Sequence, residues 1–98
     1  MTLVAIMTVR RAALELFRTF ERHAAAVMAT HGGRIERTVV VPPTDGADVL
    51  KEIHVVTFPD EQAFAAYRTD DRLRAFAHLR DEAVVRTEVH VGNDGPTY

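Results

Sequence analysis

The hydrophobic pattern begins with an almost unbroken apolar run at Leu3–Val9, which predicts a strand buried on both faces and therefore central in its sheet. Residues 10–31 then carry apolar side chains every three or four positions, the spacing of an amphipathic helix. We expect this helix to end at Gly32–Gly33, because glycine adopts the left-handed cap conformation without strain. Glu21 is expected to lie outside the apolar stripe of this helix, which consists of Ala13, Phe17, Phe20, Ala24, Val27 and His31.

Two strands joined by a turn are predicted next. Arg34–Val41 and Leu50–Phe58 are rich in β-branched residues, and the turn residues Pro42–Gly46 lie between them. These two strands should form a hairpin. Pro59 ends the second of them, and Asp60 is expected to cap or begin the following helix.

The second helical region is predicted as two helices, residues 60–68 and 71–82, separated at Thr69–Asp71. The last strand is expected over Val84–Val91. Its alternation places two sets of side chains on opposite faces of the sheet: Val85, Thr87, Val89 and Val91 on one, Arg86, Glu88 and His90 on the other.

The resulting order, βαββαβ, predicts an α+β ferredoxin-like fold with a four-stranded antiparallel sheet in the strand order 4-1-3-2. Both helical regions should cover one face of that sheet. The other face would expose apolar side chains, those of Val4, Ile6, Ile53 and Val55 or their alternates. We therefore expect a homodimer that packs two sheets face to face.

Composition narrows the class of protein further. The chain has 98 residues, a formal net charge of −2 and no cysteine, which favours one domain over residues 1–92 with a tail at 93–98 and excludes disulfides. The absence of a basic surface argues against nucleic acid as a partner, and no segment is apolar enough to predict a membrane span or signal peptide. The many Arg, Ala and Val residues suggest a bacterial protein, and we expect it to be cytoplasmic.

Several motifs in the second half of the chain resemble the dimeric α/β-barrel superfamily. They are Phe58-Pro59 at a strand end, the Ala63–Tyr67 spacing, Thr69-Asp70, Phe76 and Arg80. The resemblance is nearest to an uncharacterised small-domain family, related to antibiotic-biosynthesis monooxygenase-like and EthD-like proteins. It implies a small organic ligand bound between sheet and helices, commonly with no metal or organic cofactor, and none is expected here. The acid-Pro-x-His step of some cyclases is absent at residues 69–72.

Four residues are candidates for the chemistry of such a site. Glu52 and His54 alternate on the third strand, so both should share a face with Phe58 and point toward the helices. His54 is the candidate general base and Glu52 the residue that orients it. The alternative is a histidine satisfied by a buried hydrogen bond.

Tyr67 and Arg80 are the candidates for stabilising a negative charge on the ligand. The alternative for Tyr67 is packing at the margin of the core. The alternatives for Arg80 are an ion pair with Asp70, Asp71 or Glu52, or a charged end that reaches water.

A second Glu-x-His step, Glu88 and His90, is not expected to complete a metal site with the first. The third and fourth strands would flank the first strand, about 9–10 Å apart. His90 and Arg86 are better candidates for dimer contacts. No metal ligand is predicted.

The sequence thus indicates a protein that binds a small, apolar molecule. It could be a cofactor-independent monooxygenase, cyclase or isomerase of secondary or aromatic metabolism. The alternatives are a non-catalytic binding or stress-associated domain and a purely structural dimer, so whether the chain is an enzyme stays open at this point.

Overall fold

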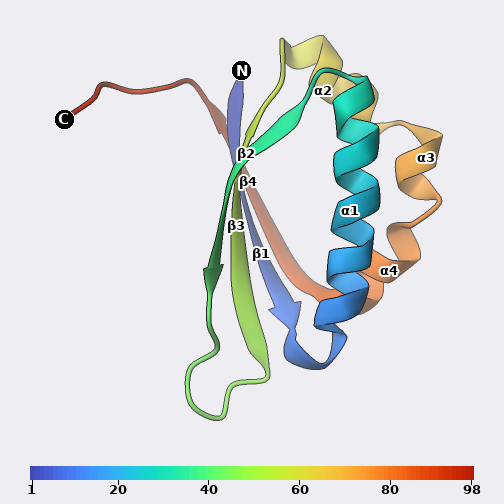
Figure 1. Cartoon of the computed structure of the whole chain (residues 1–98), viewed down its shortest axis with the longest axis vertical. Helices are drawn as coiled ribbons and strands as arrows, with labels where there is room; N and C mark the ends of the chain where they lie inside the picture. The colour runs from blue at the N-terminus through green and yellow to red at the C-terminus, as the bar shows by residue number, and fades with distance from the viewer.

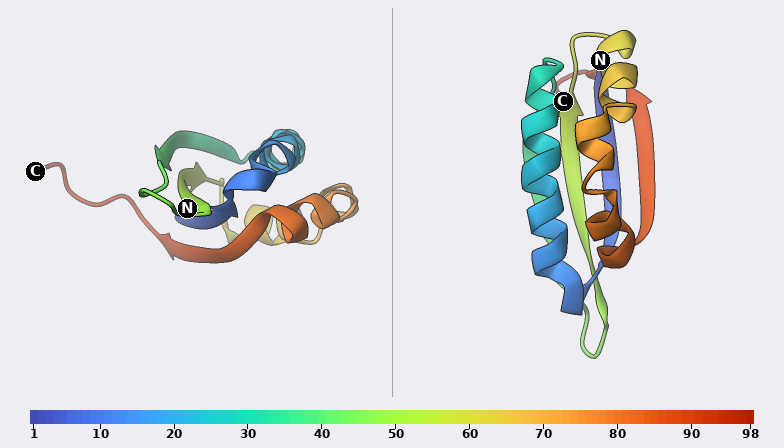
Figure 2. Two further views of the ribbon diagram at one scale, coloured as in Figure 1. Left: turned by 90° about the horizontal axis from the view of Figure 1, so that it is seen from below. Right: turned by 90° about the vertical axis from the view of Figure 1, so that its right-hand side faces the viewer.

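The computed structural model describes all residues 1–98, and the chain forms one sheet with its helices on one face (Figure 1). The elements in chain order are β1 (Thr2–Arg10), the 3₁₀ turn η1 (Arg11–Ala13), α1 (Leu14–Thr30), β2 (Arg34–Val41), β3 (Val49–Thr57), α2 (Glu61–Arg68), α3 (Asp71–Arg74), α4 (Ala77–Ala83) and β4 (Val84–Gly92). The sheet is antiparallel with the order β2-β3-β1-β4, so the predicted ferredoxin-like topology is confirmed. Residues 93–98 form no helix or strand and extend away from the sheet (Figure 2).

The register of the strands decides which side chains face the helices. Ala5 lies opposite His54, and Met7 lies opposite Glu52. Residues directly opposite each other in an antiparallel pair point to the same face of the sheet. Because Met7 is buried under the helices, Glu52 and His54 also point toward the helices, as the sequence predicts.

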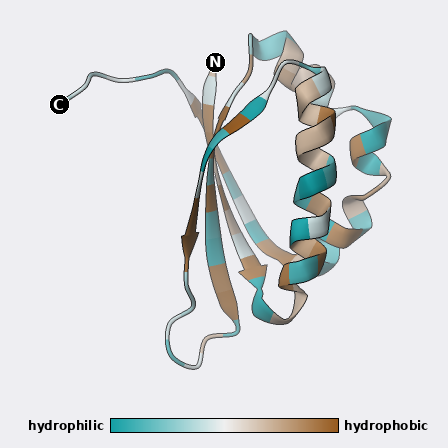
Figure 3. Ribbon diagram, viewed as in Figure 1, coloured by the Kyte–Doolittle hydropathy of each residue, from teal (hydrophilic) through white to brown (hydrophobic).

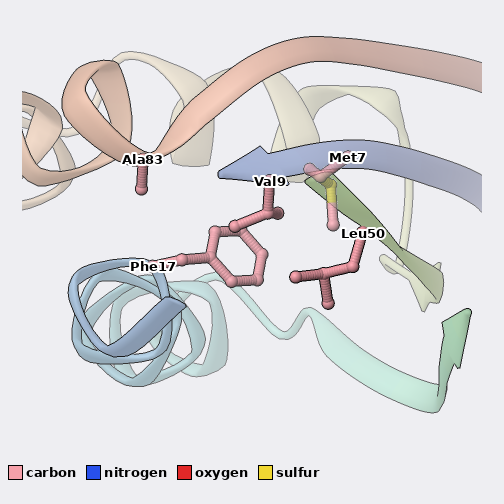
Figure 4. Close-up of a cluster of buried hydrophobic side chains, with 5 residues drawn as sticks. All are labelled: Met7, Val9, Phe17, Leu50 and Ala83. Carbon is pink, nitrogen blue, oxygen red and sulfur yellow. The ribbon is translucent and has the colours of Figure 1, made fainter. Parts of the chain in front are cut away.

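The apolar core consists of two clusters with this polar pair between them. The first cluster contains Met7, Val9, Phe17, Leu50 and Ala83 (Figure 4). The second contains Leu3, Met28, Val56 and Phe58. Along β3 the helix-facing positions are Leu50, Glu52, His54 and Val56, so the two ionisable residues interrupt an otherwise apolar face.

Gly32 and Gly33 end α1 for two different reasons. Gly32 has φ 72°, the left-handed conformation expected of a helix cap. Gly33 is instead required by close packing, because a Cβ atom there would lie 2.4 Å from the ring of Phe58 and 2.7 Å from Met28. The pair of glycines therefore brings the end of α1 directly onto β3.

The second helical region differs from the prediction. The break at Thr69–Asp70 is present, but a single helix over residues 71–82 is wrong, because the chain leaves helical geometry again at Phe76. The ring of Phe76 stacks on His23 of α1, with centroids 3.7 Å apart and planes 9° from parallel. A tertiary contact thus coincides with the second break, and three short helices follow each other along α1 (Figure 2).

The last strand alternates as predicted except at its start. Thr87, Val89 and Val91 lie opposite Met7, Ala5 and Leu3 and face the helices. Val85 has no partner in this register, which shifts between Thr8 and Val9, and its side chain is exposed. Placing Val85 with the other three was therefore wrong, because a bulge changes the alternation there.

The face of the sheet opposite the helices has no covering element (Figure 1). Val4, Ile6, Ile53 and Val55 lie on it, as their partners across the strands show, and hydrophobic and hydrophilic residues alternate along the ribbon of these strands (Figure 3). Glu88 and His90 lie on the same face, opposite Ile6 and Val4. The structure contains no helix long and apolar enough to cross a membrane.

Candidate functional site

A cavity of about 720 Å³ lies between the sheet and the helices. Its walls are mainly apolar and include Phe20 and Met28 from α1, Val56 and Phe58 from the end of β3, and Phe64 and Leu73 from α2 and α3. Ligand pockets in proteins are typically about 300–1,000 Å³ with a few convergent polar groups. The size and lining of this cavity fit that description.

The structure brings the sequence candidates together at this cavity. His54, Tyr67 and Arg80 line it directly. Glu52 does not line the cavity but contacts the imidazole of His54, with its Oε2 atom 2.7 Å from His54 Nε2. Three separate elements, β3, α2 and α4, therefore supply the candidate residues.

The Glu52–His54 pair is buried, with exposed fractions of 7% and 5%. A carboxylate only accepts hydrogen bonds, so Nε2 of His54 donates its proton to an ionised Glu52. In a neutral imidazole this leaves Nδ1 as the unprotonated nitrogen. Glu52 thereby fixes the tautomer that offers Nδ1 as a base.

Glu21 is a site residue that the sequence analysis missed. Its Oε2 atom lies 3.7 Å from His54 Nδ1, and its side chain is only 21% exposed. Burial raises the pKa of Glu21 above its ordinary value, nearby Glu52 adds to the rise, and His54 and Arg80 oppose it. His54 is therefore flanked by two carboxyl groups.

The position of Glu21 on the helix surface explains the miss. The apolar stripe predicted for this helix is narrow and does not include Met28. Met28 is buried, so the buried face of α1 is wider than expected on the side where Glu21 lies. Glu21 comes one turn after Phe17 and two turns before Met28, which is the signal that could have identified it.

Tyr67 is held at the cavity by aromatic contacts, with its ring centroid 5.4 Å from that of Phe58. Burial raises the pKa of Tyr67 to about 12, with a further rise from Glu21 and an opposing effect of Arg80. The hydroxyl group thus stays protonated at physiological pH. It can donate a hydrogen bond to a ligand oxygen but does not act as a base.

Arg80 has no acidic partner. Its Nη2 atom donates to Thr87 Oγ1 at 2.6 Å, and none of its nitrogens lies within 4.0 Å of a carboxylate. Of the two expected alternatives, the ion pair with Asp70, Asp71 or Glu52 is wrong, whereas the side chain is only half-buried and still reaches solvent. Those three carboxylates contact other groups: Asp70 contacts His31 and Arg72, Asp71 contacts Arg74, and Glu52 contacts His54.

The second Glu-x-His step is separate from this site. Glu88 and His90 lie on the face of the sheet opposite His54, with Glu88 Oε2 3.5 Å from His90 Nε2. The structure contains no group of three or more acidic or histidine side chains arranged to hold a metal ion. A second hollow, lined by residues such as Arg10, Arg11 and Asp48, contains no buried polar side chain.

Comparison with known proteins supports the fold. No protein-family model matches the chain, and no curated protein matches it significantly. Among solved structures, SnoaB, a cofactor-independent oxygenase from Streptomyces nogalater, is 21% identical over 96% of this chain and 93% of that chain, with a TM-score of 0.62. RPA0582, a protein of unknown function from Rhodopseudomonas palustris, is 15% identical over 96% and 84%, with a TM-score of 0.70.

A third similar structure is described as an antibiotic biosynthesis monooxygenase. It is 10% identical over 97% of this chain and 98% of that chain, with a TM-score of 0.66. The resemblance expected from the sequence is therefore confirmed at the level of the fold. The chain has the α+β ferredoxin-like fold of the antibiotic-biosynthesis monooxygenase-like proteins.

Proposed function

We propose that this chain is a cofactor-independent enzyme that removes a proton from an acidic carbon or phenol of an apolar substrate. The observation that carries the proposal is the buried Glu52–His54 pair beside an apolar cavity, with Nδ1 of His54 left to accept a proton. Residues 1–92 form the proposed catalytic domain of a cytoplasmic bacterial protein.

The proposed chemistry follows from the placement of charges. When His54 takes a proton, the imidazolium formed lies between Glu52 and Glu21, whose oxygens are 2.7 and 3.7 Å from its nitrogens. The electrons of the broken C–H or O–H bond move to the substrate oxygen as an enolate or phenolate. The Arg80 guanidinium and the Tyr67 hydroxyl donate hydrogen bonds to that oxygen. Such an anion can be reprotonated at another atom, attack a carbonyl group or react with oxygen, which correspond to an isomerase, a cyclase and a monooxygenase.

The oligomeric state belongs to the proposal. A second copy of the chain is proposed to cover the apolar face that carries Val4, Ile6, Ile53 and Val55. The two sheets would then pack face to face as a homodimer. The cavities lie on the helix side of each sheet, so this contact leaves both of them intact.

The test uses a probe that reports proton removal and no later step. The ketone 2-tetralone has an apolar ring system and an acidic C–H group, and its exchange with D₂O is followed by ¹H NMR. We expect the wild-type chain to accelerate exchange. His54→Gln should exchange the probe about 100-fold more slowly than the wild type, a typical contribution of general base catalysis. Glutamine can still donate to Glu52, so the fold and probe binding should be kept.

The matched control is His78→Gln, because His78 is an exposed histidine that does not line the cavity. Its exchange rate should equal that of the wild type. If His54→Gln exchanges the probe as fast as the wild type, the assignment of the base is wrong.

One observation favours a second candidate, a non-catalytic binding domain. Every fully enclosed side-chain nitrogen and oxygen already has a hydrogen-bond partner within the protein, so none of these enclosed groups requires a reacting ligand. Binding of 2-tetralone without accelerated exchange would favour this function over the enzyme.

A further inference from the structure

The charged side chains around the cavity are separated by sign. The carboxyl and imidazole groups, Glu21 and His54, come from α1 and β3. The guanidinium groups come from the three short helices that run alongside α1: Arg68 from α2, Arg74 from α3 and Arg80 from α4. A ligand in the cavity therefore meets a proton-accepting end and a cationic end.

Among the three arginines, Arg80 most clearly indicates a site for an anionic group. It is half-buried, its one hydrogen bond goes to the neutral Thr87, and no carboxylate lies within 4.0 Å of it. The charge of Arg80 acts on Glu21, but no hydrogen bond joins the two side chains. A guanidinium has five N–H donors, and most of those of Arg80 have no acceptor in the protein. The remaining donors of Arg80 are suited to an anionic group of the ligand.

Arg68 and Arg74 extend the cationic end to the surface. Both are exposed. The guanidinium carbon of Arg68 lies 5.3 Å from the centroid of the Phe64 ring, and Arg74 is 3.8 Å from Asp71, whose side chain is 97% exposed. Exposed contacts of this kind contribute little, so the side chains of Arg68 and Arg74 are only weakly fixed in place. A positive charge near a helix C-terminus is favoured by the helix dipole, which accounts for one arginine at the end of each short helix. The dipole does not explain why all three arginines line the same cavity.

We propose that the cavity takes an organic acid, a ligand with an apolar ring system and a carboxylate. In such an acid the carboxylate lies at Arg80, with Arg68 and Arg74 near the mouth, and the acidic C–H or O–H group lies at Glu21 and His54. The Tyr67 hydroxyl then donates to the enolate or phenolate oxygen, and Arg80 stabilises that oxygen through its charge. This inference rests on the proposed function of the cavity as a small-molecule site and adds the substrate class and its orientation. The volume of about 720 Å³ suits a fused-ring acid of this kind.

The experiment compares two ligands that differ only in charge, 2-naphthoate and 2-naphthamide, by isothermal titration calorimetry. We expect the acid to bind the wild-type chain about tenfold more tightly, as one charge-assisted hydrogen-bonded contact provides. Added salt should reduce that preference. Arg80→Gln should abolish most of it, whereas Arg22→Gln, a change at an exposed arginine that does not line the cavity, should keep it.

Equal affinity for the two ligands in the wild type, or no binding of either, would overturn the proposal. So would a preference that survives in Arg80→Gln and in the double variant Arg68→Gln/Arg74→Gln. The double variant keeps the test informative if Arg80→Gln does not fold, because both of its positions are exposed.

Failure of this inference can be told apart from failure of the proposed function. The ketone 2-tetralone carries no carboxylate, so its exchange tests proton removal by His54 and does not depend on recognition of an acid group. A chain that exchanges 2-tetralone but does not prefer the acid retains the proton-transfer function and loses only the substrate class.

Discussion

Two ionisable side chains in the middle of a core surface are costly unless each has a partner. Glu52 and His54 satisfy each other at 2.7 Å, and Glu21 approaches the second nitrogen of the imidazole. At the scale of single residues, this group is the most specific feature of the chain. The group links α1, which carries Glu21, to β3, which carries Glu52 and His54, in the region between the two apolar clusters.

The sequence predicts part of this group. The two-residue alternation of a strand is strict, so the face of Glu52 and His54 follows from that of Phe58. The buried face of a helix is less sharply defined, so Glu21, at the edge of that face, is predicted to lie outside the apolar stripe. The face of α4 on which Arg80 lies was predicted correctly. Its hydrogen-bond partner could not be predicted, because that depends on how far apart two elements lie, and the sequence pattern of a single element does not give this distance.

A prediction at this scale concerns Glu21→Gln. Since burial raises the pKa of Glu21 above its ordinary value of 4.5, its contribution to stability is present below that value and is lost as the pH rises through the folded-state pKa. The glutamine variant does not ionise, so it should be more stable than the wild type at pH about 8 and similar to it at pH about 4. Urea unfolding at the two pH values measures the difference.

The same variant should exchange 2-tetralone more slowly than the wild type, because only Glu52 is left to stabilise the imidazolium. A stability difference between variant and wild type that is equal at both pH values would contradict the buried position of the carboxyl group. Glu15→Gln is the control, since its side chain is 84% exposed on the same helix.

At the scale of elements, the wall of the cavity made by α2, α3 and α4 depends on a few polar contacts. Asp70 accepts hydrogen bonds from the Arg72 backbone N–H at 2.8 Å and from the Arg72 side chain, and it lies 2.8 Å from His31 of α1. Neither α2 nor α3 contains a buried residue. Asp70 therefore positions this wall against α1 where apolar packing is thin.

The first break in this wall could be predicted and the second could not. Thr69, Asp70 and Asp71 prefer helix ends because their side chains compete with backbone hydrogen bonds. Around Phe76, by contrast, Ala75 and Ala77 are strong helix formers. The second break coincides with the His23–Phe76 stacking, a contact between residues far apart in the sequence.

A prediction at this scale concerns Asp70→Asn. Hydrogen bonds from Arg72 and His31 hold the pKa of Asp70 well below its ordinary value of 3.8. A group of this kind contributes stability above its unfolded-state pKa and loses it as the pH falls through the folded-state value. The variant should therefore unfold at a lower urea concentration than the wild type at neutral pH, and the difference should shrink below pH about 4.

The control is Asp71→Asn, because Asp71 is 97% exposed and makes only the distant contact with Arg74. Hydrogen exchange of α3 amides should speed up in Asp70→Asn and stay unchanged in the control. Unchanged exchange in both variants would show that Asp70 does not hold the wall.

At the scale of the whole molecule, the chain has one covered and one uncovered sheet face (Figure 1). The order of elements was enough to predict this, since two crossover connections of the same hand put both helical regions on one side. The size and lining of the cavity depend on side-chain packing and could not be predicted. The four apolar residues on the uncovered face, Val4, Ile6, Ile53 and Val55, support the proposed homodimer.

A matched pair of valines tests the homodimer. Val55 lies on the uncovered face, opposite Val4, whereas Val40 lies opposite Glu52 on the other face and is 45% exposed. We expect Val55→Glu to convert the dimer to monomer, because like charges would be buried across the contact, and Val40→Glu to leave it dimeric. Sedimentation velocity measures both, and a wild-type chain that sediments as a monomer would contradict the proposal.

Lys51 is the only lysine in the chain. It is exposed and lies opposite Thr8 and Val41, on the uncovered face of the sheet. Amine-reactive reagents therefore find a single side chain, on the face away from the cavity. Apart from the α-amino group of Met1, a fluorophore would therefore attach only to the sheet face away from the cavity, without an engineered cysteine. How fast Lys51 reacts would report whether a second copy of the chain covers that face.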